Sequence, residues 1–161
     1  MKIYLASRYS RRAELRGYRD RLSALGHKVT SRWLDADHQN SDWRTTMADN
    51  SSDCAAELRG KFAAEDLADV RAAQVLIAFT EPPESGHSRG GRHVELGVAL
   101  GLDRRVYVVG HRENIFCWSD EVSFRETFDE VLSELGKCFC ANPLISLQDF
   151  ARTALSTLIN Q

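Results

Sequence analysis

The chain has 161 residues, of which 43% are hydrophobic and 27% charged, and its formal net charge is −2 at pH 7. This length favours one domain with a single core, and the apolar fraction excludes a mainly disordered chain. The near balance of charges excludes binding to a nucleic-acid polymer or a membrane surface by electrostatics alone. No apolar run approaches the roughly 20 residues that cross a bilayer.

The four cysteines show no CxxC spacing; they are Cys54, Cys117, Cys138 and Cys140. We expect free thiols in a reducing cytosol, and therefore a cytoplasmic protein. The lone CxC of Cys138 and Cys140 is a weak metal signal, and we expect neither a metal nor another cofactor. The apolar run over residues 1–6 is too short for a signal peptide and is interpreted as a first strand.

Strands and helices alternate along the chain. Short apolar runs predict strands over residues 2–6, 27–34, 74–80, 105–109 and 122–124. Helical periodicity predicts helices over residues 10–25, 53–73, 91–102, 126–135 and 146–159. The alternation predicts an α/β fold, with a parallel sheet covered by helices on both faces. Ligands bind at the carboxyl ends of such strands, so the loops of interest are 7–12, 34–52, 80–91 and 110–118.

Asp66 lies near the middle of an apolar arc on the helix predicted over residues 53–73. That arc comprises Leu58, Phe62, Ala63, Leu67 and Val70. A carboxylate on a core-facing stripe is unfavourable unless it is paired or lines a cavity. Asp66 could bond to nearby backbone or to Arg59, which shares the arc, or it could belong to a functional site.

Glu95 repeats this anomaly on the helix predicted over residues 91–102. It shares a face with Val98, Ala99 and Leu102 on a helix that is apolar nearly all round. It also lies in the first turns, where the helix dipole favours an ionised carboxylate. Glu95 either simply favours a helix start or marks a site together with Asp66.

The loop before Glu95, residues 85–93, reads Ser-Gly-His-Ser-Arg-Gly-Gly-Arg-His. Its hydroxyls, glycines and arginines at a helix N-terminus suit an anion, although the loop is neither a Walker A loop nor a dinucleotide GxGxxG motif. Ser7, Arg8, Arg11 and Arg12 add a second basic group after the first strand. The alternative is a flexible surface loop with solvated arginines.

Residues 1–135 resemble the nucleoside 2-deoxyribosyltransferase-like proteins, and within that group they are most similar to the nucleoside 5′-monophosphate N-glycosidases. The matching segments are KIYLA at 2–6, EDL at 65–67 followed by AQVLI at 73–77, and GGRHVELG at 90–97. The run GHRENIF at 110–116 also resembles uncharacterised members. The order and spacing of these segments carry the resemblance.

The resemblance implies a flavodoxin/Rossmann-like sheet of about five strands. It implies one such domain over residues 1–161, with 136–161 as a C-terminal helical extension. It further implies a retaining mechanism in which Glu95 is the nucleophile. Asp66 would handle the proton of the leaving base, and Tyr4 would position the nucleophile and the sugar. A glycosidic bond breaks through a cationic sugar, which is why such chemistry needs two carboxylates.

One departure from the family pattern bears on the substrate. Base-exchanging transferases carry an Asp six residues before the nucleophile, where this chain has Arg89 beside Ser88. The monophosphate glycosidases place a Ser there to contact phosphate, so a 5′-phosphate is favoured. The expected substrate-binding residues are Ser7, Arg8, Arg11, Ser88, Arg89, Gly90, Gly91 and Arg92. Trp33 and Trp43 could stack on the base or simply belong to the core.

We therefore expect hydrolysis of the N-glycosidic bond of a (deoxy)nucleoside 5′-monophosphate. The alternatives are base exchange by a deoxyribosyltransferase and a nucleotide-binding sensor without turnover. The expected partners are a small nucleotide and a second copy of the chain, without a membrane or a nucleic-acid polymer. The predicted last helix could contribute to a homodimer or pack on its own sheet; its apolar residues are Leu147, Phe150, Ala154, Leu155 and Leu158.

Overall fold

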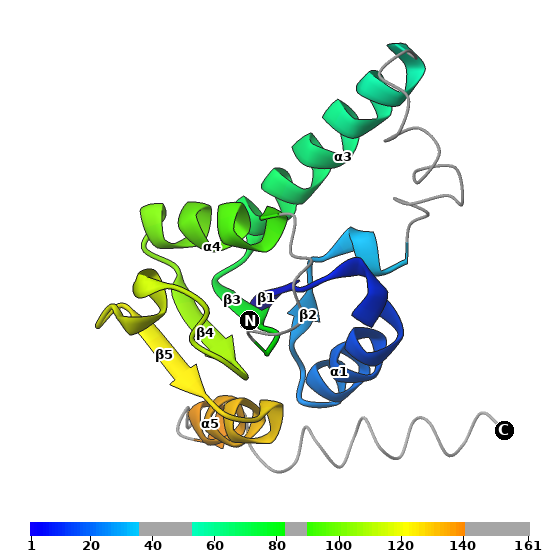
Figure 1. Ribbon diagram of the computed structural model, residues 1–161. Helices are drawn as coiled ribbons and strands as arrows, with labels where there is room; N and C mark the ends of the chain where they lie inside the picture. The colour runs from blue at the N-terminus through cyan, green and yellow to red at the C-terminus, as the bar shows by residue number, and fades with distance from the viewer. Residues whose placement is uncertain (36–52, 83–89, 141–161) are drawn as a thin grey trace, which may run out of the picture. The chain divides into compact units, whose positions relative to one another are not determined.

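The computed structural model describes residues 1–35, 53–82 and 90–140 (Figure 1). The helix predicted over residues 146–159 lies outside these residues, as do Trp43, Ser88 and Arg89. The chain divides into two compact units, Met1–Phe128 and Asp129–Gln161. None of the described helices combines the length and the apolar character that crossing a membrane requires.

The first unit is built on a five-stranded, all-parallel sheet with the strand order β2-β1-β3-β4-β5. The strands are β1 Lys2–Ala6, β2 Lys28–Val29, β3 Val75–Phe79, β4 Arg105–Val109 and β5 Val122–Arg125. All five residues of β3 are buried, as an apolar strand covered on both faces should be. The prediction of an α/β fold with about five parallel strands is confirmed.

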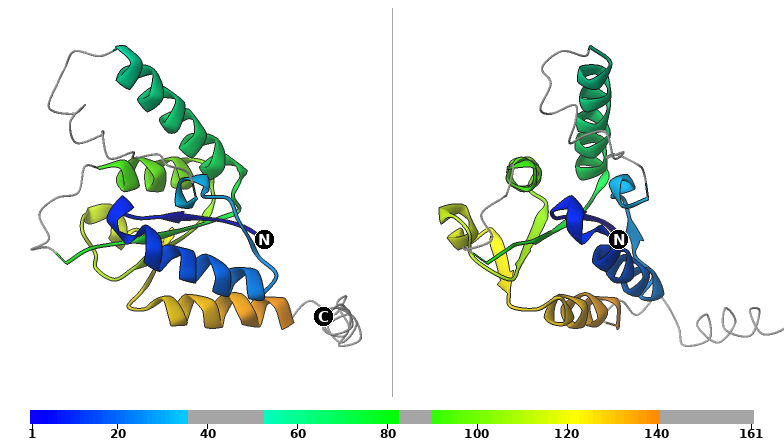
Figure 2. Two further views of the ribbon diagram at one scale, coloured as in Figure 1. Left: turned by 90° about the vertical axis from the view of Figure 1, so that its right-hand side faces the viewer. Right: turned by 45° about the vertical axis from the view of Figure 1, so that its right-hand side comes forward.

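Helices cover both faces of this sheet (Figures 1 and 2). Helix α1, Arg12–Ala24, lies on one face, where Tyr18 stacks on Phe79 of β3 at 5.1 Å between ring centroids. Helices α3, Asp53–Ala72, and α4, Gly91–Gly101, lie on the other face. Because side chains alternate along a strand, Tyr4 points to the face of α4 while Ile3 and Leu5 point to the opposite face.

The second unit contains nearly all of α5, Phe128–Cys140. Its sequence pattern predicts a helix over residues 126–135, and the helix continues for one further turn or more. Over residues 128–137, where side-chain burial is described, Val131 and Leu135 are fully buried. They are four residues apart and share one face of the helix.

The carboxyl ends of β1 and β3 form the switch point of the sheet. From β1 the chain crosses to β2 at one edge, whereas from β3 it continues through β4 to β5 at the other. The connections after β1 and β3 therefore run toward opposite edges of the sheet, and ligands bind at such a point in sheets of this kind.

Strand β2 is shorter than the strand predicted over residues 27–34. It ends at Val29, and a short 3₁₀ helix, η2 Arg32–Leu34, follows. Side chains then replace the missing backbone pairing of β1. The Leu5 N–H donates to Ser31 Oγ at 2.7 Å, and the Trp33 indole N–H donates to the Leu5 carbonyl at 3.0 Å. The apolar residues of 30–34 are thus buried by a turn and not by a strand.

Gly110 directly follows β4 and lies against Thr80, the residue that follows β3. It has φ +109°, and a Cβ there would lie 3.0 Å from Thr80 Oγ1. The Thr80 hydroxyl donates to the Val109 carbonyl at 2.9 Å. Only a residue without a side chain lets β4 turn this close to the end of β3.

Candidate active site

The centre of the candidate site is a hydrogen bond between Tyr4 and Glu95. Tyr4 is fully buried on β1, and its hydroxyl donates to Glu95 Oε1 at 2.7 Å. Glu95 lies in the second turn of α4, a helix that begins after Gly90 in a left-handed conformation with φ 80°. The sheet and the helix are therefore joined at the carboxylate that the sequence singles out.

The environment of Glu95 favours its neutral form. Its pKa is raised to about 7, mainly by burial and in smaller part by the negative charge of Asp66. The Tyr4 hydrogen bond and the positive charge of Arg92 act in the opposite direction. Burial together with the nearby carboxylates raises the pKa of Tyr4 well above its usual value, so Tyr4 remains a hydrogen-bond donor. Glu95 consequently exchanges a proton near neutral pH.

Asp66 on α3 is the second carboxylate of the pair. Burial, and then the charges of Asp69 and Glu65, raise its pKa to about 6, while Arg32 lowers it. Its Oδ1 atom is buried and has no hydrogen-bond partner among the described residues. A buried carboxylate oxygen without a partner is costly in a structural role but suits a group that meets a substrate.

The surroundings of Asp66 differ in part from the predicted apolar arc. Val70 is fully buried, but Leu67 is only half-buried and Ala63 is exposed. The arc therefore packs against the sheet near the C-terminal end of α3, and Asp66 lies where that packing begins. The negative charge of Asp66 raises the pKa of Glu95, so α3 and α4 place the two carboxyl groups within electrostatic range of each other.

Asp69 is a residue of this region that the sequence reasoning missed. It is 7% exposed, accepts a hydrogen bond from the Arg32 backbone N–H at 3.0 Å, and pairs with Arg32 Nε at 2.9 Å. It thereby ties the turn after β2 to α3, and its charge raises the pKa of Asp66. The available signal was its place three residues after Asp66, on the same side of the helix.

Arg92 occupies a different environment from the one expected of a phosphate ligand. It is 5% exposed, donates to the Phe79 carbonyl at 3.0 Å and forms an ion pair with Glu113. Glu113 also accepts from the Glu81 backbone N–H at 2.9 Å. Arg92 thus holds the start of α4 to the carboxyl end of β3, close to Glu95.

The loop after β1 holds three of the expected substrate-binding residues, and two of them contact Glu81, just after β3. Ser7 Oγ is buried and has no hydrogen-bond partner among the described residues. Arg8 faces Glu81 at 3.5 Å, whereas Arg11 pairs with Glu14 at 2.7 Å and with Glu81 at 3.4 Å. Gly90 is the N-cap of α4 and Gly91 its first residue.

Trp33 belongs to the core. It is 6% exposed and packs against Tyr9 with 6.2 Å between ring centroids, while its indole N–H is bonded to the Leu5 carbonyl. Trp33 therefore packs in the core, which was the alternative to stacking on the base. Among the described residues no group of three His, Cys, Asp or Glu side chains is placed to hold a metal ion.

Comparisons with known proteins identify the fold. No family model and no curated protein matches the sequence. The structure is similar to that of a 2-deoxyribosyltransferase from the psychrotolerant bacterium Bacillus psychrosaccharolyticus, with a TM-score of 0.59 and 20% identity over 84% of this chain and 96% of that one. The chain therefore has the fold of a 2-deoxyribosyltransferase.

A second solved structure is similar at a lower level. The CMP N-glycosidase BcmB of Clostridium botulinum matches with a TM-score of 0.46 and 17% identity, over 84% of this chain and 98% of that one. A TM-score below 0.5 is too low for this likeness to support a conclusion.

The raised pKa of Glu95 makes stability depend on pH. A carboxyl group whose pKa rises on folding binds more protons in the folded state, so its contribution is present below the unfolded value and lost as pH rises through about 7. We expect Glu95→Gln to raise the free energy of unfolding by about 2–3 kcal/mol near pH 8 and to change it little near pH 4.5. Denaturant unfolding of both proteins at the two pH values measures this difference, and an equal difference at both would contradict it.

Proposed function

We propose that this protein hydrolyses the N-glycosidic bond of a (deoxy)nucleoside 5′-monophosphate, with Glu95 as nucleophile and Asp66 as the group that exchanges a proton with the base. The observation that carries the proposal is the half-buried Glu95, held by Tyr4 at 2.7 Å and influenced by the charge of Asp66. Two carboxylates with raised pKa values at the switch point of a parallel sheet suit acid–base and nucleophilic work on a small substrate.

In the first step the Glu95 carboxylate attacks C1′ of the sugar. Tyr4 donates to Oε1, which leaves Oε2 to form the new bond. The bond between C1′ and the base nitrogen breaks, and its electron pair leaves with the base. Protonated Asp66 gives its proton to the base, so that the base departs neutral.

In the second step water releases the sugar. A water molecule attacks C1′ from the side that the base has left, and Asp66 takes one of its protons. The ester bond breaks and its electron pair returns to Glu95, which restores both carboxyl groups and gives the sugar 5-phosphate with retention at C1′. In the runner-up reaction, base exchange by a transferase, a second base attacks in place of water.

The sensor alternative agrees less well with the side chains at the site. Binding alone does not need Glu95 near a second carboxylate. Removing each carboxylate from water and placing the two near each other are both unfavourable for folding. A nucleotide-binding protein without turnover would be expected to retain the phosphate-binding loops and lose one of the two acids.

A panel of nucleotides and nucleosides, with free base measured by chromatography, tests the function. We expect base release from a nucleoside 5′-monophosphate in water alone, and loss of turnover by on the order of 10³-fold or more in Glu95→Gln. Glu121→Gln is the matched control, because Glu121 is an exposed glutamate just before the amino end of β5. Activity of Glu95→Gln within tenfold of wild type would refute the nucleophile, and turnover only when a second base is added would favour the transferase.

The pH dependence of kcat/KM separates the two carboxylates. Since Glu95 must be ionised and Asp66 protonated, and their pKa values lie near 7 and 6, we expect a bell-shaped profile with its maximum between them. Tyr4→Phe removes a hydrogen bond that lowers the pKa of Glu95, so the Glu95 limb should move to higher pH.

Asp66→Asn should shift the Glu95 limb of the kcat/KM profile in the opposite direction. It removes a negative charge that raises the pKa of Glu95, so the limb should move to lower pH, and the limb that reports protonated Asp66 should disappear. The loss of rate should be largest for bases that leave poorly without a proton. Shifts of the same sign in both variants, or an equal loss for every base, would contradict the assigned roles.

A preference for the 5′-phosphate should depend on Arg8. A charge-assisted hydrogen bond contributes on the order of 1.5–3 kcal/mol, so two or three such contacts would favour nucleotide over nucleoside by about 100-fold or more in kcat/KM. We expect Arg8→Ala to reduce this ratio. Arg92→Ala should lower kcat/KM for both the nucleotide and the nucleoside, because it removes the cation that pairs with the half-buried Glu113. Arg105→Ala, at the amino end of β4, is the control, and a wild-type preference for the free nucleoside would overturn the phosphate site.

A further inference from the structure

The turn that follows β2, residues 30–34, is bonded to the sheet on one side and to helix α3 on the other. On the sheet side, the Thr30 N–H donates to the Ile3 carbonyl at 2.8 Å, and the Ser31 hydroxyl donates to the Leu5 carbonyl at 3.2 Å. Ile3 and Leu5 are fully buried residues of β1 on either side of Tyr4. The turn therefore has a fixed position relative to the strand that carries Tyr4.

On the helix side, the turn contacts α3 around Asp66. Arg32 Nε donates to both carboxylate oxygens of Asp69, at 2.9 and 3.1 Å, and the Arg32 backbone N–H donates to Asp69 Oδ2 at 3.0 Å. The Arg32 guanidinium also donates to the Glu65 carbonyl at 3.1 Å, and the Thr30 hydroxyl donates to the Asp69 carbonyl at 3.1 Å. Glu65 and Asp69 are four residues apart and share one face of α3, beside which Asp66 lies. The turn thus holds the helix one residue before Asp66 and three residues after it.

These bonds satisfy groups that would otherwise be costly. The Asp69 side chain is only 10% exposed, and a carboxylate removed from water needs a cation and hydrogen-bond donors. The Asp69 carbonyl belongs to the last turn of α3, where carbonyl groups have no partner within the helix. The planar guanidinium of Arg32 serves a carboxylate and a carbonyl together, which the single ammonium group of a lysine does not reproduce. The end of α3 is therefore held in one orientation.

Asp66 lies between these bonds and the candidate active site. Its Oδ1 atom has no hydrogen-bond partner among the described residues. The described groups that share an electrostatic interaction with its carboxyl group come from four elements; they are Glu65 and Asp69 of α3, Arg32 of the turn, Tyr4 of β1 and Glu95 of α4. The charge of Asp69 raises the pKa of Asp66, and that of Arg32 lowers it. The two members of the ion pair thus act on Asp66 with opposite signs.

We propose that Arg32 and Asp69 are positioning residues for Asp66: through them the turn after β2 holds α3 to the strand of Tyr4 and keeps Asp66 Oδ1 available to the substrate. Proton transfer to a leaving base requires the acid within hydrogen-bonding distance of the base, and small displacements are costly in rate. Since Asp66 exchanges a proton with the base in the proposed function, this inference rests on that function.

Carbon-13 NMR of the aspartate side chains of the full chain measures the pKa of Asp66 without a substrate, and Asp66→Asn assigns the signal. Asp69→Asn keeps an oxygen that can accept the Arg32 N–H, but it removes the negative charge that the guanidinium faces. We expect the pKa of Asp66 to fall below its value of about 6 in this variant. Arg32→Gln removes the positive charge, so we expect the pKa of Asp66 to rise.

Asp35→Asn is the matched control. Asp35 also follows β2 and also pairs with an arginine, but its partner is Arg19 of α1, at 2.7 Å. We expect the pKa of Asp66 to be the same in this variant as in wild type. A purely structural role of the pair would loosen α3 and expose Asp66 to water in both Asp69→Asn and Arg32→Gln, so both variants would shift its pKa toward the ordinary carboxyl value.

Kinetics separate position from charge. Asp69→Asn should lower kcat/KM at pH 8 by about threefold for each half unit by which the pKa of Asp66 falls, because less of the acid is protonated. Arg32→Lys keeps the charge but not the simultaneous bonds to Asp69 and to the Glu65 carbonyl. We expect it to lower kcat by about tenfold for a base that leaves poorly without a proton, with KM within about twofold of wild type and the pKa of Asp66 little changed.

Possible outcomes distinguish this inference from the proposed function. Opposite shifts of the pKa of Asp66 in Asp69→Asn and Arg32→Gln support the positioning role, whereas shifts of the same sign, or none, overturn it. Circular dichroism checks that each variant is folded, and if Asp69→Asn is not, the pKa in Arg32→Gln and the kcat of Arg32→Lys decide. A wild type that releases no base refutes the proposed function. Base release with kcat unchanged in Arg32→Lys refutes the positioning role alone.

Discussion

The hydrogen bond between Tyr4 and Glu95 is the interaction on which the rest of the site depends. The Glu95 carboxyl group lies between its helix and the sheet, where the ionised form is unfavourable, and burial is the main cause of its raised pKa of about 7. Tyr4 offsets part of that penalty with a donor 2.7 Å away, from a strand whose residues 3–6 are fully buried. The position of α4 over β1 is therefore coupled to the ionisation of a single side chain.

Several ties at the edge of the sheet hold this arrangement in place. Arg92 connects the start of α4 to the Phe79 carbonyl and to Glu113, and Glu113 in turn holds the backbone of Glu81. Asp69 connects α3 to the turn after β2 through Arg32. Each tie joins elements that are distant in sequence, and together they fix the two carboxylates from opposite sides of the switch point.

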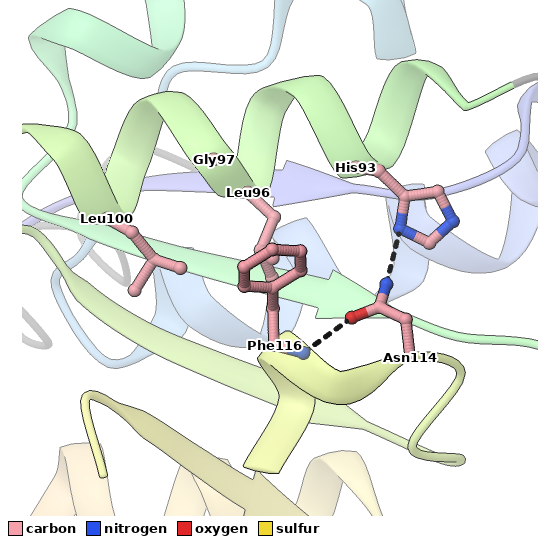
Figure 3. A pocket seen from close by; sticks show the side chains of 6 residues that line it. All are labelled: His93, Leu96, Gly97, Leu100, Asn114 and Phe116. Carbon is pink, nitrogen blue, oxygen red and sulfur yellow. Dashed lines mark hydrogen bonds between the residues drawn. The ribbon is translucent and has the colours of Figure 1, made fainter. Parts of the chain in front are cut away.

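The helix α4 presents two unlike sides. One carries Glu95 toward Tyr4, and the other contributes Gly97 and Leu100 to a hollow beside the 3₁₀ helix η4, Ile115–Trp118 (Figure 3). The hydrogen bond between His93 and Asn114 lies on the side of the hollow, whereas the ion pair between Arg92 and Glu113 lies between the two sides.

The sequence by itself determined the α/β class and most of the element positions, because apolar runs and helical arcs report burial directly. It also determined which carboxylates are unusual, since Asp66 and Glu95 each interrupt an apolar face. Tertiary structure decided the partners. The shortening of β2 depends on the Ser31 and Trp33 side chains reaching Leu5, and the pairing of Arg92 depends on Glu113, which is 21 residues away. Periodicity describes one element at a time, whereas these contacts join elements whose relative placement only the folded chain provides.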